Sequence, residues 1–457
     1  MAERVLIIGG GVSGLATAYF LSRYAIPATI LEKCNRTGGL IKTDFIDGCR
    51  LEAGPDSFIA TKPAVSELAE ELPGLKGQII GSNDAARRIF VVRNGKLVPM
   101  PTGMVMMVPG EWEPLAQSEL VSADAKRRIA EETNIKPRER QEDISVGQLV
   151  EEHFGEEVLA YLTEPLLCGV YGGDTERLSA ESVLPRFMGY ERKYGSLVKG
   201  VQQELRDKPK GGSLFLSLRD GMQALTDSLA AAIAGRVSIV HGEATSIARV
   251  GDSWHVRVGN EMLSAKNVAL CCPAHVNARL LEAAAAPLAD ELAAIPYSSA
   301  ISAMLVYDRA ALGHPLDGFG FLVPRGERKT LAAATWVNTK FPIRVRPGLA
   351  VMRAFIVGRQ AVELAKASDA EIVSSIRDDY QRLMGIAAQP LFHTLHRWPD
   401  SMPQYVVGHA QRVGKIFQGL QEYPGLFLVG NAFDGVGIPD CLRHARQMAQ
   451  HICERSV

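Results

Sequence analysis

The apolar and polar positions at the start of the chain follow an order that predicts a βαβ unit. Residues 5–8 form a short apolar run, glycines follow at once, and a segment with helical character extends to about residue 24. Pro27 interrupts this segment, and a second apolar run at 28–31 ends at Glu32. Short apolar runs bounded by turn residues are typical of buried parallel strands. We therefore expect two parallel strands joined by a helix.

The middle of the chain changes its pattern twice. Charged, helix-like segments dominate from about 100 to 205, with Pro and Gly interrupting them between 164 and 174, and they indicate an inserted helical domain. Residues 211–275 and 296–395 alternate strand-like and helical segments. The helices expected along the chain are 63–72, 123–132, 146–162, 222–234 and 369–383, and the strands are 237–240, 254–258, 267–272, 302–307, 320–323 and 350–357.

Turns and the end of the chain give further signals. Asp47-Gly48 and Asn94-Gly95 stand between apolar stretches, which predicts two hairpins. An apolar run at 425–431, a glycine-rich turn and a terminal helix to about residue 452 end the chain. This second strand–turn–helix order would again present free N–H groups, so we expect the chain end to fold back onto the first βαβ unit.

The first turn, residues 9–14, reads G-G-G-V-S-G and fits the motif G-x-G-x-x-G. Gly9 allows a tight turn, Gly11 lets the backbone approach a pyrophosphate, and Gly14 lets helix and strand pack closely. The following helix N-terminus offers N–H groups and a partial positive charge. Glu32 lies where a carboxylate accepts from a ribose hydroxyl. The pattern predicts a dinucleotide site; a βαβ turn without a ligand is the alternative.

A second glycine pair, Gly38-Gly39, identifies the class of dinucleotide. Together with Glu32 and Arg36 it resembles the E-x(n)-R-x-G-G-x-x-[ST] signature of the FAD-dependent oxidase superfamily, which includes amine oxidases, phytoene desaturases and protoporphyrinogen oxidases. Nicotinamide dehydrogenases do not usually carry this extension, so the resemblance favours FAD over NAD. An ordinary turn is the alternative for the glycine pair.

Composition narrows the class of protein. The chain has 457 residues, 47% hydrophobic and 22% charged, with a formal net charge of −1. This length is too great for one compact core, so two or three domains are expected. A basic tail, a helix-turn-helix pattern and interleaved aromatic and basic residues are all absent from the sequence, so we expect no nucleic-acid partner.

The cysteines and histidines give no sign of a metal site or a disulfide framework. The seven cysteines are odd in number and include no C-x-x-C pair. His393 and His396 form the only close pair among ten histidines and match no metal motif. Reduced cysteines are typical of the cytoplasm, where we expect the protein to be located.

Membrane signals are weak. The N-terminal apolar run belongs to the glycine motif and lacks a small-residue cleavage site, so it is not expected to be a signal peptide. An uncharged apolar stretch long enough to span a bilayer is not found. Residues 101–109 are apolar but short, and three interpretations stay open: a ligand-cavity lining, contact with a membrane surface, or core packing.

Several further motifs resemble those of the oxygen-dependent porphyrinogen oxidase family. They occur in the family's order over nearly the whole chain: Gly54-Pro55-Asp56-Ser57-Phe58, Pro99 to Gly103, Glu164-Pro165-Leu166 through Asp174 with Leu178-Ser179, Met402 to Tyr405 with Gly408-His409, and Phe433 to Cys441. The Gly-Pro-Asp-Ser-Phe, Ser-Met-Pro-Gln-Tyr and Gly-Ile-Pro-Asp-Cys forms are most similar to the soluble bacterial branch, which oxidises coproporphyrinogen III. One departure is Arg88, which stands where the membrane-bound, protoporphyrinogen IX-oxidising branch places a propionate-binding arginine.

The resemblance implies an α/β fold with α+β substrate parts. Its core would be a Rossmann-like FAD-binding domain of the amine oxidase and GDP-dissociation-inhibitor type, with a mixed-sheet substrate domain and an inserted helical domain. The implied limits are FAD-binding parts at 1–99, 206–275 and 396–457, the helical domain at 100–205, and the substrate domain at 276–395.

The implied reaction is the oxidation of coproporphyrinogen III to coproporphyrin III in haem biosynthesis. The flavin would take hydride at N5 and O2 would reoxidise it to give H2O2, so no residue is predicted as a catalytic acid or base. Protoporphyrinogen IX is the alternative substrate. A flavin amine oxidase or desaturase is a more distant alternative, and a non-catalytic binding protein like the Rab GDP-dissociation inhibitors comes from another class. Peripheral membrane contact and hand-off to a ferrochelatase are left open.

The resemblance also assigns residues to the site. Arg88 is predicted to bind a substrate propionate, and Asp56 to accept from pyrrole N–H groups beside the flavin. The residues predicted to bind FAD are Gly9, Gly10, Gly11, Val12, Ser13, Gly14, Glu32, Lys33, Arg36, Gly38, Gly39, Leu40, Gly54, Pro55, Asp56, Ser57, Ala244, Trp398, Val436, Gly437 and Ile438.

Overall fold

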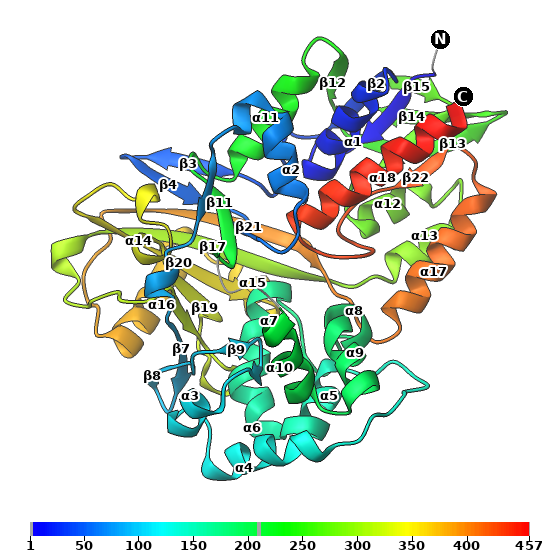
Figure 1. The fold of residues 1–457 in the computed structure, drawn as a ribbon. Helices are drawn as coiled ribbons and strands as arrows, with labels where there is room; N and C mark the ends of the chain where they lie inside the picture. Colours follow the sequence, from blue (N-terminus) through cyan, green and yellow to red (C-terminus); the bar gives the residue numbers. More distant parts are fainter. Residues whose placement is uncertain (1–2, 208–211, 457) are drawn as a thin grey trace.

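The structure is a computed structural model that describes residues 3–207 and 212–456. Three parts are visible in Figure 1: a parallel sheet with its helices at the upper right, a mixed sheet at the left and centre, and a group of helices at the bottom. Both chain ends lie close together beside the parallel sheet. The α/β class predicted from the sequence is confirmed.

The parallel sheet has five strands in the order β12-β2-β1-β16-β22. Every neighbouring pair in it is parallel. Its strands are β12 (Val237–His241), β2 (Ala28–Glu32), β1 (Val5–Ile8), β16 (Asn267–Leu270) and β22 (Leu426–Leu428). The last strand joins the first through β16, as the predicted return of the chain end requires.

The four residues of β1 are all buried and divide between two cores. Val5 and Ile7 pack with helices α1 (Val12–Arg23), α11 (Gln223–Ile233) and α18 (Ile438–Ser456) on one face. Leu6 and Ile8 pack on the other face, which α12 (Ala274–Leu281) and α13 (Ala286–Ala293) cover. A strand buried on both faces explains why this run is continuously apolar instead of alternating.

The mixed sheet has seven strands in the order β21-β17-β20-β19-β18-β7-β8. Its β18–β7 pair is parallel and its other pairs are antiparallel. The bounds are β21 (Phe392–Pro403), β17 (Tyr297–Asp308), β20 (Leu349–Val357), β19 (Ala333–Trp336), β18 (Gly320–Leu322), β7 (Ile89–Arg93) and β8 (Lys96–Pro99). The predicted limits at 99/100 and 395/396 do not coincide with this sheet, because β7 and β8 belong to it and β21 crosses the second limit.

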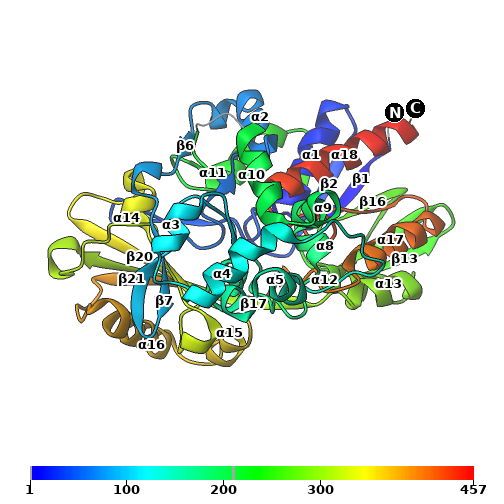
Figure 2. The ribbon, with the colours of Figure 1, turned by 60° about the horizontal axis from the view of Figure 1, so that its bottom comes forward.

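The helical part comprises α3 to α10, and Figure 2 brings it to the front. The single helix predicted over 146–162 is wrong in detail, because Gly155, with φ of 90°, separates α5 from α6. The interruption predicted between 164 and 174 is also wrong at its start: α7 is helical, with Pro165 in its first turn, where a missing N–H does no harm. The helices are α3 (Trp112–Gln117), α4 (Ala123–Glu131), α5 (Val146–Phe154), α6 (Glu156–Val158), the π-turn Leu159–Thr163, α7 (Glu164–Tyr171), α8 (Ala180–Val183), α9 (Pro185–Tyr194) and α10 (Leu197–Asp207).

The apolar stretch at 101–109 forms the short hairpin of β9 (Met104–Val105) and β10 (Val108–Pro109). Met107 and Val108 are fully buried, and the stretch packs on the core of the helical part. Core packing is thus the interpretation that the structure supports. In the part of the chain that the structure describes, no helix is both long and apolar enough to cross a bilayer.

Smaller elements complete the fold. Asp47 and Asn94 both have positive φ and lie in the two predicted hairpin turns, between β3 and β4 and between β7 and β8. The remaining elements are β3 (Thr43–Ile46), β4 (Cys49–Glu52), β5 (Phe58–Ile59), β6 (Ile79–Gly81), β11 (Phe215–Leu218), β13 (Ala244–Val250), β14 (Ser253–Val258), β15 (Glu261–Ala265), α2 (Ala64–Glu71), α14 (Val337–Lys340), α15 (Arg359–Leu364), α16 (Asp369–Met384) and α17 (His409–Gly419), with short 3-10 turns between them.

Candidate active site

The turn between β1 and α1 needs glycine at two positions. Gly9 has φ of 103°, which residues with a side chain rarely adopt, and its N–H donates to the Leu31 carbonyl at 2.9 Å. A Cβ atom at Gly14 would lie 1.9 Å from the Gly9 carbonyl oxygen. The structure therefore gives these glycines the tight turn and the close packing expected of them.

The second glycine pair lies directly against this turn. The Gly38 N–H donates to the Gly10 carbonyl at 2.8 Å, and a Cβ atom at Gly39 would lie 3.1 Å from the Gly11 Cα. The Arg36 guanidinium donates to carbonyl oxygens of this loop, including that of Gly39. Arg36 thus shapes the loop that carries the pair, and two motifs about thirty residues apart in sequence become one backbone surface.

Glu32 stands at the end of β2, with its carboxylate bound to backbone. One oxygen accepts from the Gly10 N–H at 2.7 Å and the other from the Cys34 N–H at 2.8 Å. A carboxylate has about four acceptor positions, so capacity is left for ribose hydroxyls. The Glu32 carbonyl also accepts from the Gly242 N–H at 2.9 Å, which brings the start of β13, with Ala244, into the same neighbourhood.

These groups fit the dinucleotide half of FAD. No side chain caps the N-terminus of α1 at Gly11, and the first-turn N–H groups of an α-helix, here those of Val12 and Ser13, have no partners within the helix. A Cβ atom at Gly11 would meet only the Gly39 Cα, at 3.9 Å. Open backbone donors at the positive end of a helix suit a pyrophosphate, and Glu32 suits a ribose. Lys33 and Leu40 are exposed beside this surface, and their contacts with FAD stay predictions.

The C-terminal motif lies at the N-terminus of α18, which packs alongside α1. The Asp440 carboxylate accepts from the Gly437 N–H at 3.2 Å and from Lys62 Nζ at 2.7 Å. These bonds fix the turn that carries Val436 and Ile438, the other residues predicted to contact the cofactor. Lys62 was not singled out from the sequence, because its partner is 378 residues away.

The segment 53–57, which carries Gly54 and Pro55, is held from two sides. On one side, a Cβ atom at Gly54 would lie 1.9 Å from the Leu40 carbonyl oxygen, so this segment packs against the glycine loop. On the other side, Trp398 Nε1 donates to the Ala53 carbonyl at 2.8 Å, and Arg353 donates to the Gly54 carbonyl. Trp398 and Arg353 come from β21 and β20, so the mixed sheet positions this segment beside the dinucleotide surface.

Asp56 is the centre of a buried ionic network. Its carboxylate binds Lys340 Nζ at 2.8 Å and the Ser57 hydroxyl at 2.7 Å, and Arg353 Nη1 lies 3.7 Å away. Burial alone would raise the pKa of Asp56, but Lys340 and Arg353 outweigh it and hold that pKa well below its usual range. Asp56 is therefore a carboxylate already bound to protein cations, and its predicted contact with pyrrole N–H groups stays a prediction.

Glu52 and Arg344 extend this network inward. Arg344 Nη2 lies 3.0 Å from Glu52 Oε1, and Arg344 Nη1 donates to the Asp56 carbonyl at 3.1 Å. Burial raises the pKa of Glu52, although Arg344 opposes the shift. We call the five side chains the Asp56 cluster: Glu52, Asp56, Lys340, Arg344 and Arg353.

Four of the five cluster members were missed in the sequence. A signal existed for Arg353, which is the single charged residue in the apolar run at 350–357 that predicted a buried strand. A charge in such a strand must find a partner, because burying it unpaired is costly. The partner itself could not be found, since Asp56 lies almost 300 residues away.

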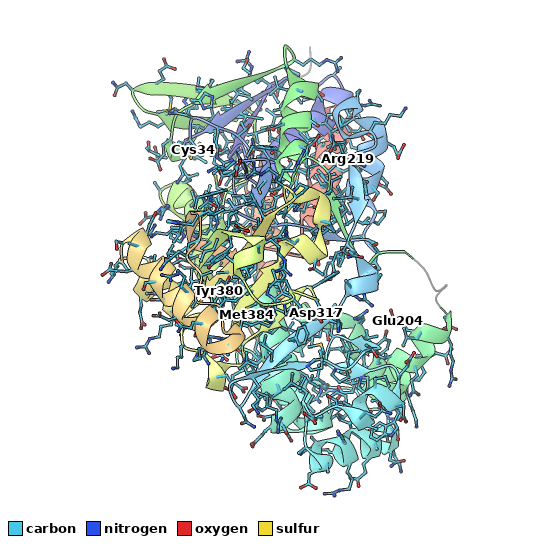
Figure 3. The ribbon with its side chains drawn as sticks, turned by 90° about the vertical axis from the view of Figure 1, so that its left-hand side faces the viewer. Cys34, Glu204, Arg219, Asp317, Tyr380 and Met384 are labelled. Atoms are coloured by element: carbon cyan, nitrogen blue, oxygen red, sulfur yellow. The ribbon has the colours of Figure 1, made fainter. Side chains whose placement is uncertain are left out.

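Arg88 lies apart from this network, on the surface. It precedes β7, its side chain is 54% exposed, and its guanidinium binds the Asp317 carboxylate at 2.7 Å. Figure 3 shows Asp317 between the mixed sheet and the helical part, as seen from that side. Asp317 is thus the partner of Arg88 in the structure, and contact with a substrate propionate stays a prediction.

Residues 3–207 and 212–456 form neither a metal site nor a disulfide. No group of three or more His, Cys, Asp or Glu side chains there is placed to hold a metal ion, and the cysteines are free. His396, from the close histidine pair, instead binds the Asp44 carboxylate at 2.7 Å.

Comparisons with known proteins agree with this geometry. Residues 12–453 match the family of flavin-containing amine oxidoreductases. The chain is 32% identical to coproporphyrinogen III oxidase of Bacillus subtilis, with 96% of each chain aligned. It is 28% identical to the chloroplastic protoporphyrinogen oxidase 1 of Arabidopsis thaliana, over 97% of this chain and 87% of that one.

A solved structure is similar over the same length. A protein from Exiguobacterium named as a protoporphyrinogen oxidase has a TM-score of 0.89 and 30% identity, covering 100% of this chain and 99% of that one. The family confirms the predicted FAD cofactor and the predicted oxidoreductase class. The chain therefore belongs to the flavin-containing amine oxidoreductases and, within them, to the oxygen-dependent porphyrinogen oxidases.

Proposed function

We propose that the protein oxidises coproporphyrinogen III to coproporphyrin III with O2, releasing H2O2, in haem biosynthesis. The main support for this proposal is the 32% identity to a coproporphyrinogen III oxidase across 96% of both chains. The dinucleotide surface and the segment beside it supply the cofactor site that this reaction needs.

The conversion removes hydrogen from saturated meso carbons in successive two-electron steps, each matched by reduction of one O2 to H2O2. FAD, when bound, supplies the hydride acceptor. The protein's own contribution is binding and orientation. Gly9 to Gly14 and Glu32 hold the nucleotide, and the segment 53–57 forms a fixed support between that surface and the mixed sheet. Correct placement of a reacting C–H bond lowers a barrier by several kcal/mol.

Arg88 is the proposed contact for a substrate carboxylate. A guanidinium grips a propionate through two parallel hydrogen bonds. Its present partner, Asp317, is 42% exposed, and an exposed ion pair contributes at most about 1 kcal/mol. The propionate can therefore replace Asp317 at little cost.

Protoporphyrinogen IX oxidation is the second candidate. It is favoured by the similarity to the Arabidopsis protoporphyrinogen oxidase and by the Exiguobacterium structure. The two substrates differ in the number of propionates, so the number of cations that contact the substrate separates them.

The test is an aerobic fluorescence assay of the purified, flavin-loaded protein with both porphyrinogens. We expect a higher kcat/KM for coproporphyrinogen III. A higher value for protoporphyrinogen IX would establish the second candidate, and failure to oxidise either, with FAD bound, would overturn the substrate assignment. Turnover of an amine in the same preparation would identify an amine oxidase instead.

We also propose that the protein is cytoplasmic. Contact with a membrane surface and transfer of product to a ferrochelatase stay predictions. Vesicle flotation and pull-down with a ferrochelatase would test these two contacts separately.

A further inference from the structure

The Asp56 cluster holds more positive than negative charge. Its three cations, Lys340, Arg344 and Arg353, face only two carboxylates, Glu52 and Asp56. Among residues 3–207 and 212–456, these carboxylates are the only acidic side chains in ion pairs with the three cations. Arg344 and Arg353 are almost fully buried, and the Lys340 side chain is 12% exposed.

A surplus buried charge is unfavourable unless an anion compensates it. Lys340 shows most clearly that an additional partner would fit. Its ammonium group has three N–H donors, and its hydrogen-bond partners are Asp56 Oδ2 at 2.8 Å and the Ser57 hydroxyl at 3.3 Å. The rings of Phe215 and Phe341 lie about 5 Å from Lys340 Nζ and keep part of its surroundings apolar.

The surplus charge lies beside the segment predicted to support the flavin. Arg353 donates to the Gly54 carbonyl, and Lys340 binds both Asp56 and Ser57. Gly54 in turn packs against the Leu40 carbonyl, next to the glycine pair of the dinucleotide surface. The cluster therefore adjoins the cofactor site, and two of its cations, Lys340 and Arg353, share the single carboxylate of Asp56.

We propose that Lys340 and Arg353 hold a surplus positive charge beside the flavin ring and thereby favour its reduced, anionic form. The inference rests on the proposed function, because it needs FAD against the segment 53–57. When the ring accepts a hydride it gains one negative charge, and a nearby fixed cation stabilises that charge. Asp56 limits the effect, since it neutralises part of the same charge.

The test is the reduction potential of the FAD-loaded protein, measured without substrate by equilibration with a reference dye. Lys340→Met removes a positive charge and should lower the two-electron reduction equilibrium constant about tenfold, which is about 30 mV. Asp56→Asn removes a negative charge and should shift the potential the other way. Lys340→Arg should keep the wild-type value. The control is Arg359→Met, which removes an exposed cation of α15.

Shifts of the reduction potential in opposite directions for Lys340→Met and Asp56→Asn indicate an electrostatic role. A structural role, in which either substitution loosens the segment 53–57, would shift both potentials in the same direction. Equal shifts, or no shift, in variants that retain FAD would overturn the proposal. So would an unchanged potential for Lys340→Met with a raised KM for porphyrinogen, because the surplus charge would then serve a substrate carboxylate. If Asp56→Asn does not retain FAD, the comparison of Lys340→Met with Lys340→Arg decides. Failure to oxidise either porphyrinogen, with the potential shifts present, would refute the proposed function alone.

Discussion

Two groups of buried charges in this molecule differ in how their charges balance. The Asp56 cluster lies between the parallel and mixed sheets and has three cations for two carboxylates. The His153 cluster lies within the helical part. It has three carboxylates, Glu132, Glu152 and Glu191, and three basic groups, His153, Arg138 and Arg140.

The charged groups of the His153 cluster are paired with one another. Both ring nitrogens of His153 contact carboxylates, Glu132 at 2.7 Å and Glu191 at 3.0 Å, so both must donate and the ring is an imidazolium. Glu132 also accepts from the Leu197 N–H at the start of α10. Arg140 and Arg138 close the network on Glu191 at 2.7–2.8 Å. Glu132 and Glu191 thus tie α5, α9 and α10 to the turn after α4.

Charge balance distinguishes the structural network from the network that adjoins the cofactor site. A balanced network is complete without a partner, so removing one member leaves opposite charges buried alone. An unbalanced network is complete only when an anion is bound, so removing its surplus member costs little until the ligand is present.

The largest effect is expected from breaking the balanced network. In Glu191→Leu, Arg138 and Arg140 keep only the partly exposed Glu152, and His153 keeps only Glu132. The network then carries more positive than negative charge, and the free energy of unfolding should fall by about 3–5 kcal/mol. Glu191→Gln should lie between this variant and wild type. Denaturant unfolding measures the change, and Glu363→Leu, an exposed carboxylate on α15, is the matched control. A loss no larger than the control's would show that the network contributes nothing.

The contribution of the His153 cluster to the free energy of unfolding should also depend on pH. Burial by itself lowers the pKa of His153, but Glu132 and Glu191 outweigh it and raise the pKa above the usual value. A raised pKa in the folded state means that the stabilisation is complete below about pH 6.5 and is lost as pH rises through the folded-state value.

Unfolding free energies of wild type and His153→Gln, compared between pH 6 and pH 9, check this dependence. The difference between the two proteins should be greatest at the acidic end and shrink toward the alkaline end. A difference that grows with pH would contradict the imidazolium assignment.

A smaller effect is expected from the unbalanced network without flavin. Lys340→Met leaves two cations with two carboxylates, and Asp56 keeps Arg353 at 3.7 Å, so the flavin-free protein should lose less unfolding free energy than Glu191→Leu does. Denaturant unfolding of flavin-free and flavin-loaded forms separates the two states. A loss as large as that of Glu191→Leu in the flavin-free form would remove the distinction between the clusters.

The smallest effect on stability is expected at Arg88, whose ion pair is exposed. Arg88→Ala should leave the unfolding free energy and the flavin content unchanged. It should still raise the KM for porphyrinogen, because a charge-assisted contact with a propionate contributes about 1.5–3 kcal/mol. Unchanged steady-state kinetics would exclude Arg88 from the substrate site, and Arg346→Ala, another exposed arginine in an ion pair, is the control.

Local sequence signals predicted much of the fold. The βαβ unit, both hairpin turns and the helix at Asp369–Met384 follow from apolar periodicity and from glycine or capping residues within a few positions of each other. The helix predicted over 146–162 failed at Gly155, where apolar periodicity continues through a residue whose positive φ breaks the helix. The Pro and Gly residues after Glu164 predict an interruption, but Pro165 lies in the first turn of α7, which tolerates proline.

The dinucleotide surface can be predicted from the sequence, because its function depends on backbone shape, and backbone shape follows from glycines at fixed short spacings. The Asp56 cluster, by contrast, depends on tertiary packing. Lys340 and Arg353 lie 284 and 297 residues from Asp56. Only the packing of α14, which carries Lys340, and of β20, which carries Arg353, brings them to Asp56. A charged residue in an apolar strand pattern indicates that a buried partner is needed. The identity of that partner depends on how distant elements pack, which no local sequence pattern predicts.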